Sequence, residues 1–249
     1  MIVALNLVPE RREVRDPIPH EVAVSDPQFV RTMSSVFGND VKPGHRIETL
    51  RNGDEIFQPM LEAIAQATDA INFLTYIYWS GEIEVLQGAR FNPEQKAAGE
   101  VLAQHVKSSR VGGSRSMHQM MLMALSAANS HVRIAMGYFA PDDVIIRQML
   151  DARKRGVEID VLIPGDEIDV PLVRRASRHI WGPMLEAGIR IHEYQPTNFH
   201  AKLIVVDEHW TTIGSANFDE RSFRLNDESI LMFTIGHLPW SSRPFSMTT

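Results

Sequence analysis

The sequence predicts an α/β fold, because segments with helical periodicity alternate with short apolar segments typical of strands from residue 114 onward. The chain has 249 residues, of which 44% are hydrophobic and 22% charged, so it can bury a sizeable core in one large domain or two modest ones. No stretch of the sequence approaches the roughly 18 consecutive apolar residues that a membrane-spanning helix requires. We therefore expect a globular chain that does not span a bilayer.

Composition excludes several kinds of chemistry. The chain has no cysteine, so disulfide frameworks, thiolate zinc sites and cysteine nucleophiles are all excluded. Catalytic groups must come from His, Lys, Asp, Glu, Ser or a cofactor. The formal net charge of −6 argues against a protein whose main role is to coat nucleic acid. The amino end lacks the features of a secretory signal peptide, so we expect a cytoplasmic protein.

The amino-terminal part of the chain changes character near residue 46. Residues 1–45 carry no sustained period and contain five prolines, which indicates an extended or poorly ordered leader. Residues 47–50 then favour a short strand, and 55–67 favour a helix with Asp54 as its N-cap. A buried strand rich in Ile, Phe, Tyr and Trp is expected over 70–79.

The remainder of the chain repeats this alternation over a longer stretch. The helix expected over 116–128 carries an apolar stripe that consists of Met117, Met120, Met121, Ala124, Leu125 and Ala128. Helices are expected over 116–128, 142–155 and 170–187. Strands are expected over 131–136, 157–163, 189–194, 201–206 and 211–213. The pattern is that of an α/β unit with its strands at the centre.

A shift of 61 residues aligns two helix-strand units with each other. It places the apolar set Met60, Leu61, Ala63 and Ala67 on Met121, Leu122, Ala124 and Ala128. This agreement suggests two copies of one unit, the first of which is much shorter. The alternative is that any two amphipathic helix-strand units agree this well at their apolar positions.

A cluster of polar residues near residue 200 carries the strongest chemical signal. In a strand, residues two apart point to the same face, so His200 and Lys202 project side by side. The lysine cation lowers the pKa of the imidazole, which keeps a neutral nitrogen available as a nucleophile, and it also attracts an anionic group. This pairing suits a phosphate ester as substrate.

A second segment supplies hydrogen-bond donors for such a substrate. Gly214 and Ser215 are expected to form a sharp turn that presents backbone N–H groups and the Ser215 hydroxyl, while Asn217 offers its amide to phosphoryl oxygens. The alternative is that His200 and Lys202 are surface residues of an edge strand and that Gly-Ser is an ordinary hairpin turn.

The spacing of these residues decides between the two interpretations. His200, Lys202 and Asp207, followed by Gly214-Ser215-Ala216-Asn217, resemble the HxKxxxxD…GSxN signature of the phospholipase D superfamily. The flanking sequence over 166–228 resembles the carboxy-terminal half of bacterial cardiolipin synthases, and the likeness extends over roughly 46–230. The segments that carry it include Tyr138-Phe139-Ala140-Pro141-Asp142, Glu193-Tyr194-Gln195-Pro196, Arg221-Ser222-Phe223-Arg224-Leu225-Asn226 and Thr75-Tyr76-Ile77-Tyr78-Trp79.

The resemblance implies a phospholipase D-like sandwich, in which a mixed β-sheet is flanked by helices. On this interpretation residues 1–45 are the leader, 46–113 a truncated first half, 114–235 a complete second half, and 236–249 an irregular tail. The first copy of the motif is missing. The only other HxK, His105-Val106-Lys107, has Gly112 where the acidic residue should fall, and we do not interpret it as a motif.

The resemblance also implies roles for individual residues. One histidine of the family attacks phosphorus to form a phosphohistidine, and another protonates the leaving alcohol. His200 belongs to this pair, and no cofactor or metal is implied. The expected roles of the other residues are phosphoryl binding by Lys202 and Asn217, assistance by Ser215, a structural or orienting part for Asp207, and orientation of the histidine by Glu228.

The implied substrate is a phospholipid such as phosphatidylglycerol, handled at the inner face of the cell membrane by a peripheral protein. Arg174, Arg175 and Arg178 are expected either near the lipid phosphate or on a solvated helix face. Because only one motif is present, two outcomes stay open: a homodimer that supplies the second motif, or an inactive truncated remnant. A nucleic-acid phosphodiesterase of the same superfamily, working as a homodimer, is the alternative function, and the net charge weighs against it.

Overall fold

The computed structural model describes residues 14–38, 40–69, 71, 97–108, 116–224 and 226–234. The chain divides into two units, one formed by residues 1–42 and 102–249 and the other by 43–101. The predicted site residues all lie in the larger unit. The expected domain boundaries remain a prediction.

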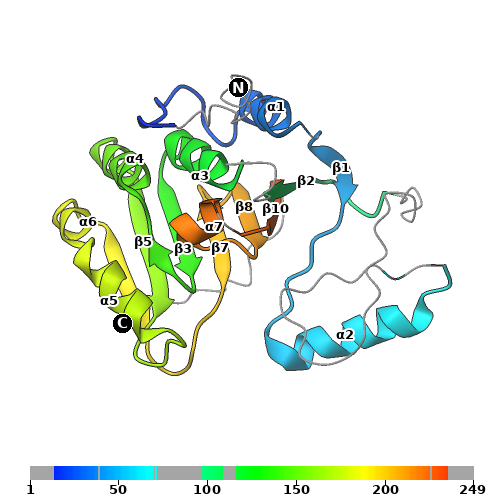
Figure 1. Ribbon diagram of the computed structural model, residues 1–249. Helices are drawn as coiled ribbons and strands as arrows, with labels where there is room; N and C mark the ends of the chain where they lie inside the picture. The colour runs from blue at the N-terminus through cyan, green and yellow to red at the C-terminus, as the bar shows by residue number, and fades with distance from the viewer. Residues whose placement is uncertain are drawn as a thin grey trace, which may run out of the picture. The chain divides into compact units, whose positions relative to one another are not determined.

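A mixed β-sheet forms the centre of the larger unit (Figure 1). Its strands follow the order β2-β10-β8-β7-β3-β5-β6. The strand bounds are β2 Val101–Ser108, β3 His131–Met136, β5 Glu158–Pro164, β6 Arg190–Tyr194, β7 Lys202–Val206, β8 Trp210–Gly214 and β10 Glu228–Thr234. β3, β5 and β6 pair in parallel, whereas β7, β8, β10 and β2 join the sheet antiparallel. The strand β1, Lys42–His45, lies at the junction of the two units.

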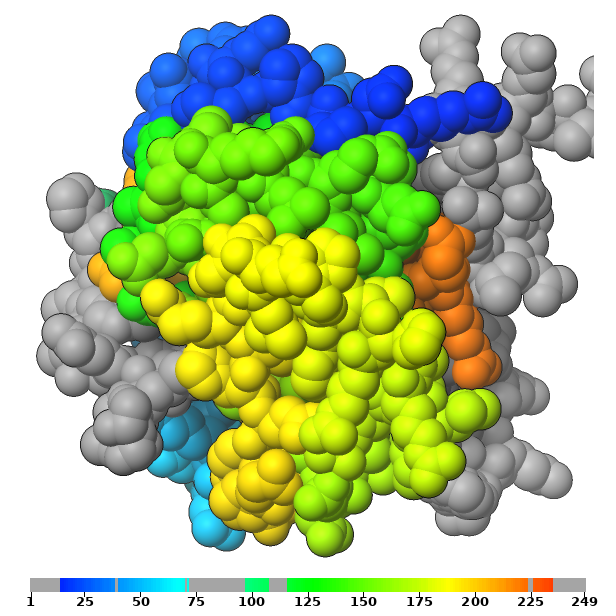
Figure 2. Space-filling model, turned by 90° about the vertical axis from the view of Figure 1, so that its left-hand side faces the viewer, coloured from blue at the N-terminus to red at the C-terminus, as the bar shows by residue number. Residues whose placement is uncertain are grey.

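Helices cover one face of this sheet. Figure 1 shows α4, α5 and α6 beside the sheet, and in Figure 2 their green to yellow atoms form much of the face turned to the viewer. The helix bounds are α1 Pro27–Phe37, α3 Ser116–Ala127, α4 Asp143–Lys154, α5 Pro171–His179, α6 Gly182–Glu186 and α7 Glu220–Arg224. A short parallel pair, β4 Phe139–Ala140 with β9 Phe218–Asp219, lies outside the main sheet. The expected mixed sheet flanked by helices is therefore confirmed.

The hydrophobic core lies between the sheet and α3. Alternate residues of the central strands point into it, including Val132, Ile134, Ile204, Val206, Ile230 and Met232. The predicted apolar stripe of α3 is buried, and so are residues on its other faces, for example Leu122 at 0% exposure and His118 at 3%, whereas Ser116, Gln119 and Met123 are half-buried. A helix buried on more than one face needs a second covering layer.

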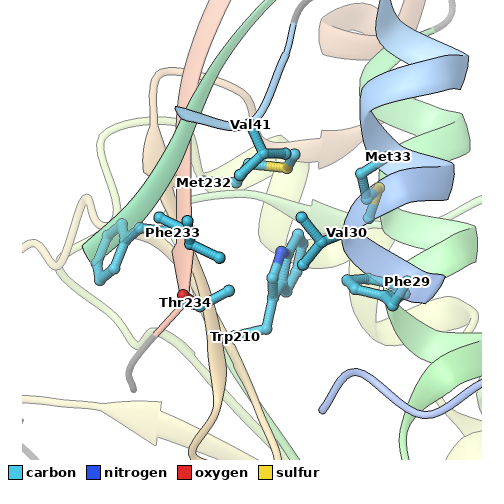
Figure 3. Close-up of a pocket in the computed structure, with 9 residues that line it drawn as sticks. Phe29, Val30, Met33, Val41, Trp210, Met232, Phe233 and Thr234 are labelled. Atoms are coloured by element: carbon cyan, nitrogen blue, oxygen red, sulfur yellow. The ribbon is translucent and has the colours of Figure 1, made fainter. Parts of the chain in front are cut away.

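Residues 14–38 supply that layer, so the expectation of a poorly ordered leader is wrong for this segment. Asp26 caps α1 by accepting from Gln28 N at 2.7 Å, and Pro27 begins the helix. Phe29 and Met33 are buried in the core. Figure 3 shows α1 facing the sheet across a narrow apolar pocket. In this pocket the Phe29 and Trp210 rings pack edge to face, with their centroids 5.9 Å apart.

Several other elements differ from those that the sequence predicts. The helix expected over 170–187 is two helices, because Pro183 in the first turn of α6 cannot continue α5. The strand expected over 47–50 is absent from the described structure, and Asp54 lies inside α2, Asn52–Gln66, rather than capping it. The strands β2 and β10 were not predicted.

The smaller unit is described mainly by α2. This helix contains Pro59 and has no buried residue, and Phe57 and Leu61 are 58% and 57% exposed. The strand expected over 70–79 lies outside the described residues except for Ile71. None of the helices in the described part of the chain is long and apolar enough to cross a membrane.

The packing of α1 makes a testable claim about stability. We expect Met33→Ala to lower the free energy of unfolding by about 2–5 kcal/mol, because it removes a side chain that is 1% exposed in the core. Val36→Ala, on the exposed side of the same helix, should change it by less than about 0.5 kcal/mol. Urea denaturation followed by circular dichroism measures both, and equal values for the two variants would contradict the packing of α1.

Candidate active site

The registers of β3, β7, β8 and β10 bring the predicted site residues other than Asp207 together at one end of these strands. Lys202 pairs with Met136 of β3, so the chain at the end of β3 lies beside the start of β7. Gly214, at the end of β8, pairs with Ile230 near the start of β10. Residues that are far apart in sequence therefore meet where these four strands begin or end.

His200 and Lys202 lie against each other, as predicted. The Lys202 Nζ lies 2.9 Å from His200 Nδ1, 3.1 Å from Nε2 and 3.0 Å from the His200 carbonyl oxygen. Packing around the ring lowers the pKa of His200, and the Lys202 cation lowers it further, while Asp169 opposes them. The imidazole is therefore held in its neutral, nucleophilic form near pH 7.

Burial also lowers the pKa of Lys202, to about 8, although three carboxylates oppose this shift. They are Glu228, Asp169 and Asp219. Burial raises the pKa of Asp219 itself, against the hydrogen bond that Ser222 N donates to it at 2.7 Å. Lys202 is thus a partly desolvated cation, which suits the binding of an anionic oxygen.

Two residues at the end of β3 form one wall of the site. Gly137 N donates to Ala201 O at 2.8 Å, and a Cβ at Gly137 would fall 2.7 Å from His200 Cδ2 and 3.0 Å from Lys202 Nζ. Only glycine leaves room for both side chains. The Tyr138 ring meets the His200 ring edge to face, with centroids 5.5 Å apart and an interplanar angle of 78°.

Asn217 is buried and held in one orientation. Its Oδ1 accepts from Tyr138 N at 3.2 Å, and its own backbone N donates to Ser222 Oγ at 3.0 Å. The bonds that the described structure gives Asn217 leave its Nδ2 amide to donate to a phosphoryl oxygen, in keeping with the predicted role.

Ser215 and Glu228 bond each other instead of the histidine. Ser215 Oγ donates to Glu228 Oε2 and accepts from Ser229 N at 3.0 Å, while Asn226 Nδ2 donates to Glu228 Oε1 at 3.1 Å. In the described part of the chain no hydrogen bond joins Glu228 to His200, so its predicted orienting role stays a prediction. The expected free backbone donor at Ser215 is wrong, because Ser215 N donates to Ser229 O at 3.0 Å.

The glycine before Ser215 is required by close packing rather than by a turn. A Cβ at Gly214 would lie 2.2 Å from the Ser229 carbonyl oxygen and 2.8 Å from Ile230 Cα. Because these atoms belong to the backbone of β10, they cannot move aside as a flexible side chain can. Gly214 thus allows β10 to bring Glu228 next to Ser215.

Asp207 lies at the opposite end of β7, roughly 16 Å along the strand from Lys202. Its carboxylate accepts from the backbone N–H groups of Asn129, Ser130 and His131 at 2.8–2.9 Å, and from Ser130 Oγ at 2.8 Å. Burial raises its pKa, but these bonds outweigh burial and hold the pKa below its usual value. The contacts of Asp207 fit the structural part expected of it.

Several sequence candidates lie outside this cluster. His105 is on β2, where its Nε2 lies 2.6 Å from Ser229 Oγ, and Ser229 points to the opposite face of β10 from Glu228. Arg174 and Arg178 both bind the Glu193 carboxylate; Arg174 is half-buried, whereas Arg178 is exposed on the solvated face of α5. Arg175 is exposed.

Sequence reasoning missed Gly137, Tyr138 and Asp169 as members of the site. Tyr138 Oη donates to Asp169 Oδ2 at 2.8 Å, which links the loop before α5 to the histidine. Only the resemblance around Tyr138-Phe139-Ala140 gave a signal for any of them. Within the described residues, no three His, Asp or Glu side chains are grouped to hold a metal ion.

Comparison with known proteins agrees with the motif. Residues 121–235 match the family described as "Cardiolipin synthase, PLD-like domain". Cardiolipin synthase A of Serratia proteamaculans is 35% identical over 116 residues, which are 47% of this chain and 24% of that protein. The probable cardiolipin synthase YwiE of Bacillus subtilis is 30% identical over 171 residues, 69% of this chain and 34% of that protein.

The chain spans about a quarter to a third of the length of these relatives. Among solved structures, Nuc from Salmonella typhimurium, a phospholipase D family member, is 24% identical. The match covers 54% of this chain and 84% of that one with a TM-score of 0.46. The family match spans both the His200–Asn217 motif and the strands that position it, and residues 121–235 therefore form a cardiolipin synthase-like domain of the phospholipase D superfamily.

Proposed function

We propose that this chain catalyses phosphatidyl transfer of the cardiolipin synthase type, with His200 as the nucleophile. The observation that carries the proposal is the meeting of a neutral imidazole, a partly buried ammonium and an oriented amide at one edge of the sheet. The names of its relatives point to the same chemistry.

The reaction would proceed in two displacements. A neutral nitrogen of His200 attacks phosphorus of phosphatidylglycerol, the bond to the glycerol oxygen breaks, and a phosphatidyl-histidine forms. Glycerol leaves with a proton from a second histidine, which then takes a proton from the hydroxyl of another phosphatidylglycerol as that hydroxyl attacks phosphorus. Lys202 and the Asn217 amide stabilise the negative charge on the phosphoryl oxygens in both steps.

The second histidine is proposed to be His200 of another copy of the chain. His105 and His118 contact Ser229 and Asp142, so the structure gives both of these histidines partners other than Lys202. A twofold contact lets each copy provide the same residue to one shared site. Because the substrate resides in a bilayer, we further propose that the protein acts peripherally at the cytoplasmic face of the membrane.

Replacement of the nucleophile tests the proposal directly. We expect His200→Ala to lower the rate of cardiolipin formation from phosphatidylglycerol vesicles by about 10⁴-fold, to background, with chromatography of labelled lipid as the measurement. His209→Ala, in the turn at the far end of β7, is the matched control and should retain activity. Cleavage of single-stranded DNA without lipid turnover would favour the nuclease alternative instead.

The pH profile tests the electrostatics of the pair. We expect kcat/KM to be highest near the lowered pKa of His200, where one copy is neutral and the other carries the proton for the leaving glycerol, and to fall on both sides of it. Above pH 8 it should fall more steeply, because Lys202, with its pKa near 8, loses the charge that binds phosphate. Lys202→Arg keeps its charge at all these pH values, so the steeper fall above pH 8 should be absent in that variant; its persistence would assign it to another group.

Subunit mixing tests the shared site. When wild-type chain and His200→Ala are mixed and allowed to exchange, activity should follow the square of the wild-type fraction, about one quarter at equal amounts. A linear dependence would show that each chain acts alone. Light scattering on the same samples gives the mass of the active species.

A further inference from the structure

Tyr138 contacts three parts of the active site at once. Its ring meets the His200 ring at 5.5 Å, its backbone N donates to Asn217 Oδ1 at 3.2 Å, and its hydroxyl donates to Asp169 Oδ2 at 2.8 Å. These contacts connect the end of β3 with β7, β9 and the loop before α5. No role in the motif has been assigned to either Tyr138 or Asp169.

We propose that Tyr138 and Asp169 form a positioning pair that holds the His200 ring in place and keeps a carboxylate beside it. The inference rests on the proposed function, since it concerns the nucleophile of that reaction. The edge-to-face contact restricts the tilt of the imidazole, and Gly137 presses the same ring from the backbone side. Asp169 is exposed, and its bond to the Tyr138 hydroxyl keeps it from turning into solvent.

The carboxylate has a chemical purpose at this position. The ring of His200 becomes cationic when it carries the phosphatidyl group, and a nearby negative charge stabilises that cation. In the described contacts Glu228 is engaged with Ser215 and Asn226, whereas Asp169 is held near the ring by Tyr138. Burial and the bond to Asp169 raise the pKa of Tyr138 to about 12, which keeps its hydroxyl protonated as the donor.

Charged and titratable groups from several elements surround the pair formed by His200 and Lys202. The titratable groups near His200 and Lys202 are Tyr138 after β3, Asp169 before α5, Asp219 on β9 and Glu228 on β10. Among them, Asp169 is the carboxylate that raises the pKa of His200. Removal of the Asp169 carboxylate should therefore lower the pKa of His200, a change that can be measured without any turnover.

Histidine-selective NMR titration of the full chain tests the pair independently of activity. The resonance of His200 is assigned with His200→Gln. We expect Asp169→Asn and Tyr138→Phe each to lower the pKa of His200, and the double variant to lower it no further than Asp169→Asn alone, because both remove the same held carboxylate. Glu167→Gln removes an equal charge two residues away and should leave this pKa unchanged.

Kinetics on phosphatidylglycerol vesicles provide the second arm. Tyr138→Phe and Asp169→Asn should lower kcat about 10- to 100-fold with little change in KM, whereas Glu167→Gln should match wild type. If the chain has no transferase activity, the titration alone still tests whether Tyr138 and Asp169 act as a positioning pair. If transfer occurs but neither the pKa nor kcat responds to the two variants, or if Glu167→Gln has an equal effect, the positioning role is wrong while the proposed function stands.

Discussion

The site depends on the register between β3 and β7, and the Asp207 carboxylate secures that register. It binds the backbone of residues 129–131 just before β3, while Asp207 N donates to His131 O. Asp207 and Glu208 both have positive φ, and His209 N donates to Val206 O, as in a tight hairpin turn of the primed type. A slip of one residue would turn Lys202 to the other face of the sheet. The acidic residue of the motif therefore acts on the catalytic end of β7 from the opposite end of the strand.

At the start of β7, the cation of Lys202 lies near several carboxylates. Lys202 lies beside a neutral imidazole and within the influence of Glu228, Asp169 and Asp219, all in a partly buried setting. A lysine with a pKa near 8 loses less on giving up water to a phosphate than a fully hydrated one would. The nearby carboxylates oppose the loss of its charge. This balance would allow a chain of net charge −6 to bind the phosphodiester that is proposed as its substrate.

Local patterns predicted the regular elements of the larger unit well and its boundaries less well. The strands at 131–136 and 201–206 and the helix at 116–127 were recovered because their periods match their burial. Residues 14–38 were misread since their prolines suggested disorder, whereas Pro27 begins a helix whose Phe29 and Met33 enter the core. β2 was not predicted because its burial does not alternate regularly: the neighbouring Ala103 and Gln104 are both buried.

The sequence by itself determined which residues form the candidate site, because His200, Lys202 and Asn217 lie within 18 consecutive residues and the first two are two residues apart at the start of β7. It could not show what surrounds them. Tyr138 and Asp169 stand about 60 and 30 residues before the histidine in the chain, and Gly137 looks like any turn glycine until His200 is seen packed against it. Only the tertiary structure decided these neighbours, because strand register and helix packing, rather than proximity along the chain, bring the end of β3 and the loop before α5 to the imidazole.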